Sequence, residues 1–303
     1  MSEPNKPIAH WQRQISAIAS GFLGDWLEQR DNPLAVSMQL LHQRQPLDSA
    51  NPRVENPRDT LVVLIHGLTE METIWEYPGQ PGVHYGTELA PLLKATPLLL
   101  RYNTGRPIYR NGEALSWALE SLVDNWPVPV TRLILIGHSM GGLLIRSACH
   151  HARLLHQSWT GCLSDCVYLG APHDGSWLAK AAQHSANLLG KMPRDYLRVV
   201  GDFLDLRSEG IRDLTRGEIL REAEELSPLY PGARHYAIAG LLARQPENPL
   251  NRLFGDALVH EDSAHGAGQA GWALTDTASF GGIDHIRLTH HPRVYQQLKE
   301  WLL

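Results

Sequence analysis

The chain has 303 residues, of which 43% are hydrophobic and 19% are charged, and its formal net charge is −5. This composition is ordinary for a globular protein with a large core, and it argues against a disordered chain. The small negative charge and the lack of a long basic run argue against a nucleic-acid-binding surface or an anionic-lipid anchor.

The N-terminal residues 1–35 predict a helical extension. Their apolar residues recur at intervals of three or four, which places them on one face of a helix. These residues are Trp11, Ile15, Ile18, Phe22 and Trp26. Asn32-Pro33 ends the pattern. Alternating apolar and polar residues over 36–40 then predict a half-buried strand, and the Pro-, Asn- and Arg-rich segment 44–59 reads as a connector.

Short apolar runs alternate with helical patterns along the rest of the chain. The runs occupy 61–65, 97–100, 133–136, 166–169 and, more weakly, 236–239. Continuous apolar runs are typical of central parallel strands that are covered on both faces. Apolar residues at helical spacing mark 115–123 and 141–156, and His291-Pro292 opens a last helix. This order predicts an α/β fold with a mostly parallel central sheet flanked by helices.

The segment 176–232 is longer than a simple crossover between two strands. Helical patterns around 178–189 and 196–206, with Pro193 between them, predict a helical cap or lid over the sheet. A plain structural excursion is the alternative for parts of this segment. We treat 1–303 as a single domain that carries the N-terminal extension and the cap.

Gly137-His138-Ser139-Met140-Gly141 fits the G-x-S-x-G motif. It directly follows an apolar run and directly precedes a helical pattern, as the nucleophile elbow of a serine hydrolase requires. Glycines two residues on either side of the serine relieve crowding between the turn, the strand and the helix. The helix N-terminus, with its positive dipole end, is then aimed at the reacting centre. An ordinary glycine-rich turn is the weaker interpretation.

A second element, Ile65-His66-Gly67-Leu68, ends the earlier apolar run. An enzyme of acyl transfer needs two backbone N–H groups that bind the developing oxyanion. Here those donors are the amides of Leu68 and Met140. His66 as a catalytic base is a competing interpretation, but a histidine beside this glycine is better suited to hold the loop by hydrogen bonds.

Serine is a poor nucleophile until a histidine, oriented by a carboxylate, takes its proton. In this fold the carboxylate follows the serine along the chain and the histidine comes last. We favour Asp256, which follows the run at 236–239 after a long loop, and His285, which lies between a turn at 279–282 and the last helix. The other acids considered are Asp174, Glu261, Asp262, Asp276 and Asp284, and the other bases are His290 and His291.

These motifs resemble those of bacterial lipases and esterases of the α/β-hydrolase superfamily. The chain looks most similar to the PGAP-like group, which is related to GPI-inositol deacylases. The matching stretches are LVVLIHGL (61–68), LILIGHSMGG (133–142), VYLGAPHDGS (167–176), GDALVHEDSA (255–264) and GGIDHIRLTHHPRVYQQLKEWL (281–302). The resemblance implies a triad of Ser139, Asp256 and His285, and an oxyanion hole formed by the Leu68 and Met140 amides. Ala257 stands where this family more usually has glycine.

Two further motif matches are rejected. Residues 266–271 fit G-x-G-x-x-G, but no apolar strand precedes them, so a dinucleotide site is not expected. Residues 260–265 resemble H-E-x-x-H, but the second histidine comes one residue late. That spacing does not place both rings on one helical face, so a zinc protease is not expected.

Cysteine content and hydropathy indicate the compartment. Cys149, Cys162 and Cys166 are too few for a disulfide framework, so free thiols are expected. The N-terminus lacks the basic and apolar regions of a signal peptide, and no stretch approaches the ~18 uninterrupted apolar residues of a membrane span. We therefore predict a cytoplasmic protein without an integral membrane segment.

The sequence predicts a serine carboxylic ester hydrolase, either an esterase or a lipase. It forms an acyl-enzyme on Ser139, acts on a small-molecule or lipid-like ester, and needs no metal or organic cofactor. An acyltransferase or amidase on the same triad, or a non-catalytic binding protein with this fold, are the alternatives. The oligomeric state is not indicated.

Overall fold

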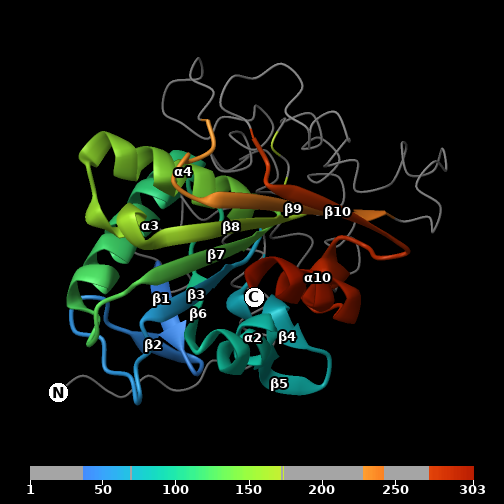
Figure 1. The fold of residues 1–303 in the computed structure, drawn as a ribbon, viewed down its shortest axis with the longest axis horizontal. Coiled ribbons are helices and arrows are strands. Elements are labelled where there is room, and N and C mark those ends of the chain that lie inside the picture. The colour runs from blue at the N-terminus through green and yellow to red at the C-terminus, as the bar shows by residue number, and fades with distance from the viewer. Residues whose placement is uncertain (1–36, 69, 172, 174–227, 242–272) are drawn as a thin grey trace, which may run out of the picture.

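The computed structural model describes residues 37–68, 70–171, 173, 228–241 and 273–303. The predicted N-terminal extension and nearly all of the predicted cap lie outside the described residues. The last residues of the cap segment, 228–232, lead into a strand. The described part is built on an eight-stranded sheet of order β10-β9-β8-β7-β3-β6-β1-β2 (Figure 1).

The predicted mostly parallel sheet is confirmed. Its strands are β1 (Gln39–His42), β2 (Gln45–Leu47), β3 (Thr60–Ile65), β6 (Ala95–Arg101), β7 (Arg132–His138), β8 (Leu163–Leu169), β9 (Arg234–Leu241) and β10 (Asp276–Gly281). The six strands from β6 to β10 in the sheet order pair in parallel, whereas β1 pairs antiparallel with both β6 and β2. A separate hairpin consists of β4 (Glu76–Tyr77) and β5 (Gln80–His84).

Helices cover both faces of the sheet. The described ones are α2 (Tyr85–Leu93), α3 (Ile108–Asn125), α4 (Met140–Leu155) and α10 (Pro292–Leu302), with short 3-10 helices η1 (Glu72–Trp75), η2 (Ser158–Cys162) and η3 (Ile286–Thr289). Leu61 and Val63 of β3 pack in the cluster that contains the α3 and α4 side chains. Val62 and Leu64 pack in the cluster that contains those of α2 and α10. Because successive strand residues point to opposite faces, β3 is buried on both sides (Figure 1).

The predicted turn at 279–282 is wrong for most of its length, because β10 extends through Gly281 and only Gly282, with φ of 76°, has turn geometry. β10 is an edge strand, so its residues are half-buried or exposed. An edge strand has no continuous apolar run that would mark it in the sequence. The same reason explains β2, a short edge strand within the predicted connector 44–59.

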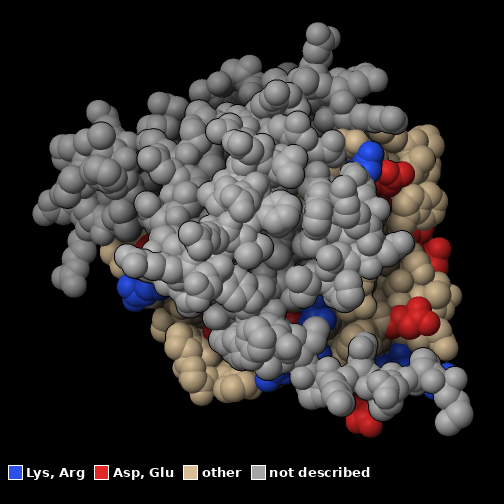
Figure 2. All heavy atoms as spheres, turned by 180° about the vertical axis from the view of Figure 1, so that it is seen from behind, with Lys and Arg blue, Asp and Glu red and all other residues tan. Residues whose placement is uncertain are grey.

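Three further features can be compared with the sequence: membrane-spanning helices, charged side chains and cysteines. In the part of the chain that the structure describes, no helix has both the length and the apolar character needed to cross a membrane. Lys and Arg side chains lie interspersed with Asp and Glu around the edge of the face drawn in Figure 2. All three cysteines are free, as expected.

Helices α3 and α4 touch through a glycine. A Cβ atom added at Gly112 of α3 would lie 2.5 Å from Cβ of Ser147 on α4, and closer still to its Oγ. Both residues are buried. The close approach of these two helices therefore depends on the absence of a side chain at position 112.

We predict that Gly112→Ala destabilises the protein by about 1–3 kcal/mol, since the added methyl group overpacks this contact. Urea unfolding followed by circular dichroism measures the change. Gly161→Ala in η2 is the matched control, because its added Cβ meets no atom within 4 Å. Equal stability of the two variants would contradict the predicted contact.

Candidate active site

Ser139 and His285, two of the catalytic residues predicted from the sequence, lie at one edge of the sheet, formed by the carboxyl ends of its parallel strands. Parallel strands β3, β7, β8 and β10 all end at this edge. Gly67 follows β3, Ser139 follows β7, Gly170 follows β8 and His285 follows β10. Sites of α/β proteins lie outside the carboxyl ends of such strands, so the topology alone brings these four positions together.

Ser139 forms the turn between β7 and α4. Its backbone has φ of 52° and ψ of −123°, and the residue is only 7% exposed. A non-glycine residue held in such a conformation stores about 1–3 kcal/mol of strain. The Ser139 N–H donates to the Leu169 carbonyl at 2.9 Å, and the Ser139 carbonyl accepts from the Gly142 N–H at 3.0 Å. The strained turn is therefore held from both sides, as a nucleophile elbow requires.

The two motif glycines relieve the crowding that the sequence predicted. A Cβ atom at Gly137 would lie 2.6 Å from the Gly141 carbonyl carbon. A Cβ atom at Gly141 would lie 2.7 Å from the His66 carbonyl oxygen. Real Cβ atoms do not approach other atoms this closely, so a side chain at either position would separate β7, α4 and the loop after β3.

The ring of His285 lies against Gly170. A Cβ atom at Gly170, whose φ is +58°, would lie 2.9 Å from Nδ1 of His285 and 3.0 Å from its Cε1. Gly170 directly follows Leu169, which accepts the Ser139 N–H. Ser139 and His285 therefore contact successive residues of the same turn.

The two alternative histidines have local structural roles. His290 Nδ1 lies 2.9 Å from the Thr289 hydroxyl at the end of η3. His291 is the N-cap of α10, and its Nδ1 accepts the Arg293 N–H at 3.2 Å. The expected helix-start role of His291 is confirmed.

Two of the alternative acids also have other partners. Asp284 accepts the Arg287 N–H at 2.9 Å within the turn before η3. Asp276 is the first residue of β10, so it lies at the amino end of that strand, away from Ser139. Its carboxylate accepts from the Trp301 ring N–H at 2.8 Å. Asp256, the favoured acid, lies outside the described residues, as do Asp174, Glu261 and Asp262.

The loop after β3 is held by two hydrogen bonds to one carbonyl group. The Gly67 carbonyl lies 3.0 Å from His66 Nδ1 and 3.4 Å from the Glu70 N–H. Because the C=O and N–H of a trans peptide point in opposite directions, these bonds turn the Leu68 N–H away from them. Burial lowers the pKa of His66, so this ring is neutral and donates through Nδ1. His66 thus has the loop-holding contact expected from the sequence.

Met140 is the first residue of α4. An N–H group in the first turn of a helix has no acceptor within that helix. Leu68 follows Gly67, whose added Cβ would lie 2.8 Å from Cβ of Ser139. Both predicted amide donors therefore belong to segments that border Ser139, and their role as an oxyanion hole stays a prediction.

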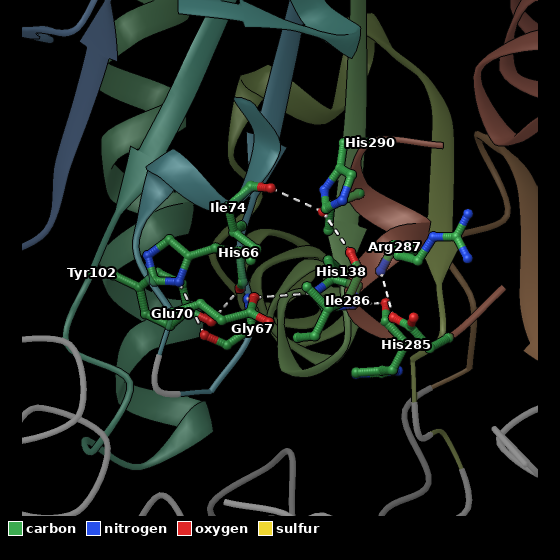
Figure 3. Close-up of polar contacts among 12 residues, drawn as sticks. His66, Gly67, Glu70, Ile74, Tyr102, His138, His285, Ile286, Arg287 and His290 are labelled. Carbon is green, nitrogen blue, oxygen red and sulfur yellow. Dashed lines mark hydrogen bonds and ion pairs between the residues drawn. The ribbon is translucent and has the colours of Figure 1, made fainter. Parts of the chain in front are cut away.

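Sequence reasoning missed a contact between Glu70 and His138. Glu70 Oε2 lies 3.0 Å from His138 Nδ1, and His138 Nε2 lies 3.0 Å from the His285 carbonyl oxygen (Figure 3). Burial raises the pKa of Glu70, but His138 and the Gly67 N–H outweigh it and hold the pKa below its ordinary value. No motif marks Glu70; the only signal is a carboxylate three residues after the loop glycine.

Among the described residues, no three His, Cys, Asp or Glu side chains come together in a group suited to a metal ion. The chemistry that the described arrangement offers is that of a serine in a strand-to-helix turn with a histidine at the same turn.

Comparison with known proteins bears on the fold of the chain. The PGAP1-like alpha/beta domain family matches residues 104–194, which include Ser139. The mature form of the Bacillus licheniformis lipase BlEst2 is similar in structure, with a TM-score of 0.53 at 18% identity over 83% of this chain and 96% of that chain. Its propeptide form has a TM-score of 0.51 at 18% identity over 82% of this chain and 52% of that chain. No curated protein matches this chain in sequence.

We predict that Gly170→Ala slows the reaction of Ser139 with a fluorophosphonate about 10–100-fold, because the new methyl group displaces the His285 ring from its place on Gly170. Mass spectrometry of the modified serine measures the rate. Gly79→Ala is the control, since Gly79 also has positive φ, +75°, but its added Cβ meets no atom within 4 Å. Equal rates in the two variants would show that the His285 ring does not depend on this contact.

Proposed function

Since this chain has the α/β-hydrolase fold and resembles the PGAP1-like family, we propose that it is a serine carboxylic ester hydrolase. Ser139 is the nucleophile, His285 is the general base and Asp256 is the acid that orients it. One observation carries the proposal. The N–H of strained Ser139 donates to the Leu169 carbonyl, and the His285 ring packs against the next residue, Gly170.

The reaction proceeds through an acyl-enzyme. His285 takes the Ser139 proton as the serine oxygen attacks the ester carbonyl carbon, and Asp256 stabilises the imidazolium that forms. His285 then gives this proton to the leaving alcohol as the ester C–O bond breaks. A water molecule, deprotonated by His285, attacks the acyl-enzyme, and the acid leaves as Ser139 regains its proton.

The oxyanion of each tetrahedral intermediate is bound by the amides of Leu68 and Met140. Loss of one such donor costs about 3 kcal/mol of transition-state stabilisation. Support comes from the hydrogen bonds that fix the Gly67 carbonyl and from the place of Met140 at the start of α4. No step of this mechanism requires a metal or an organic cofactor.

The substrate is a small-molecule or lipid-like ester. BlEst2, which this chain resembles in fold, is named a lipase. An esterase prefers short acyl chains in solution, whereas a lipase prefers long ones, so a series of acyl lengths separates the two. Transfer products in mixed alcohol and water would reveal an acyltransferase, and cleavage of matched anilides would reveal an amidase.

We predict that Ser139→Ala lowers turnover of p-nitrophenyl esters by roughly 10⁴–10⁶-fold, because no other group supplies the nucleophile. The wild type and the variant are compared over acyl chains of increasing length. Ser279→Ala, on the exposed face of edge strand β10, is the control and retains wild-type turnover.

Substantial turnover by Ser139→Ala would exclude this serine as the nucleophile. If the wild type hydrolysed no ester of any length and its Ser139 resisted fluorophosphonates, the fold would serve binding alone. Ready labelling of Ser139 without turnover of simple esters would leave the nucleophile in place and point to a different acyl donor.

Asp256 is tested separately. We predict that Asp256→Asn lowers kcat by about 10⁴-fold, because an amide holds the histidine in the wrong tautomer. Asp262→Asn, six residues along the same segment, retains wild-type kcat. The reverse result for the two variants would assign the acid to Asp262.

A further inference from the structure

The contact between Glu70 and His138 lies next to the proposed catalytic serine, which directly follows His138, and is largely shielded from solvent. The His138 side chain is 0% exposed and the Glu70 side chain 10% exposed. Glu70 Oε2 accepts the Gly67 N–H at 2.6 Å in addition to its contact with His138. The protonation of these two side chains is therefore set by their neighbours and not by water.

The partners of His138 specify its protons. Nε2 faces the His285 carbonyl oxygen, which only accepts, so Nε2 carries a proton. Nδ1 faces an oxygen of Glu70. A neutral imidazole with its proton on Nε2 would turn the lone pair of Nδ1 toward the lone pairs of a carboxylate. Two arrangements avoid this repulsion: an imidazolium beside a carboxylate, or a neutral imidazole beside a protonated acid.

The surroundings of Glu70 favour the carboxylate. A carboxylate that accepts an N–H bond is stabilised in its charged form. Burial acts in the opposite direction on the pKa of Glu70, but the net pKa lies below its ordinary value. The Gly67 N–H and His138 Nδ1 both point at the same Glu70 oxygen, Oε2, at 2.6 Å and 3.0 Å. Two donors on one oxygen suit a carboxylate, so we place the second proton of the pair on His138.

We propose that Glu70 and His138 are positioning residues of the ester hydrolase. They form a buried carboxylate–imidazolium pair that fixes the loop after β3 and His285 relative to Ser139. This inference rests on the proposed function, since it assigns the pair a purpose in that reaction. Neither side chain touches the substrate; each acts through the backbone that it holds.

One pair connects three segments that are far apart in the chain. Glu70 holds the N–H of Gly67, the residue before the proposed oxyanion donor Leu68. His138 directly precedes Ser139 and holds the carbonyl of His285. The two histidine rings also contact each other, with centroids 4.5 Å apart (Figure 3). The His285 ring is thus bounded by His138 on one side and by Gly170 on another.

Glu70→Gln removes the negative charge at position 70 and keeps the size of the side chain. The glutamine amide oxygen can still accept the Gly67 N–H, but it cannot stabilise an imidazolium. His138 then becomes neutral and retains one N–H for two acceptors. Either the bond to position 70 or the bond to the His285 carbonyl is lost, and the loop concerned shifts.

The experiment measures kcat and KM for the best p-nitrophenyl ester. We expect Glu70→Gln to lower kcat about 10–100-fold while KM stays within about 3-fold, as displaced catalytic groups do. Glu72→Gln is the matched control. It also removes a buried carboxylate, two residues along the chain. In the described part of the chain Glu72 pairs with Arg101 and makes no hydrogen bond to Gly67, His138 or His285. Its kcat should stay within about 2-fold of wild type, although its unfolding midpoint falls.

A second measurement needs no variant. ¹⁵N-histidine spectra of the wild type at pH 8 should show both ring nitrogens of His138 protonated, with the resonances assigned by contacts to the rings of Trp75 and His285. A single protonated nitrogen would overturn the ion pair.

A folded Glu70→Gln with wild-type kcat would overturn the positioning role. If the wild type hydrolysed no ester, the proposed function would fail, while the spectra would still decide whether the ion pair exists.

Discussion

The strained backbone of Ser139 is the constraint on which the rest of the site depends. Its cost of about 1–3 kcal/mol persists because the surrounding contacts leave the turn no alternative. Buried strand β7 enters the turn, buried helix α4 leaves it, and Leu169 of β8 accepts its amide. This turn also sets how closely α4 approaches the end of β3, because Gly141 of α4 packs against the His66 carbonyl there. Three central strands are thereby fixed to one another at the edge where Ser139 and His285 lie.

The histidine segment needs an anchor of its own because it follows an edge strand. Among the described strands, β10 pairs with β9 alone, and it is half-exposed. The sheet therefore holds its carboxyl end less firmly than the ends of β3 and β7. Contacts with the central strands compensate for this. His138, at the end of β7, holds the carbonyl of His285, and Gly170, after β8, supports its ring. The proposed base is therefore positioned by the centre of the sheet and not by the strand that precedes it.

The sequence predicts those features that leave a local pattern. Each of the five apolar runs lies within an observed strand, because strands covered on both faces cannot alternate with polar residues. The elbow at Ser139 could be predicted because its strand, turn and helix are contiguous. Edge strands β2 and β10 were not predicted, since a half-exposed strand lacks such a run. The contacts of Glu70 and Gly170 could not be predicted either, because each joins loops whose distance in space no local pattern encodes.

The G-x-S-x-G motif does not specify the residue before the serine, but the contacts of His138 restrict which residue can stand there. In G-x-S-x-G the residue before the serine is unspecified, yet here it is wholly buried between two acceptors on opposite sides of its ring. Only the imidazolium of histidine offers two N–H donors in that geometry without a long flexible chain, because an amide carries both of its N–H bonds on one nitrogen. The choice of histidine at 138 is thus tied to a carboxylate at 70, which balances the charge. The informative sequence signal for this site is therefore a pair of positions, one in the loop after β3 and one in the elbow.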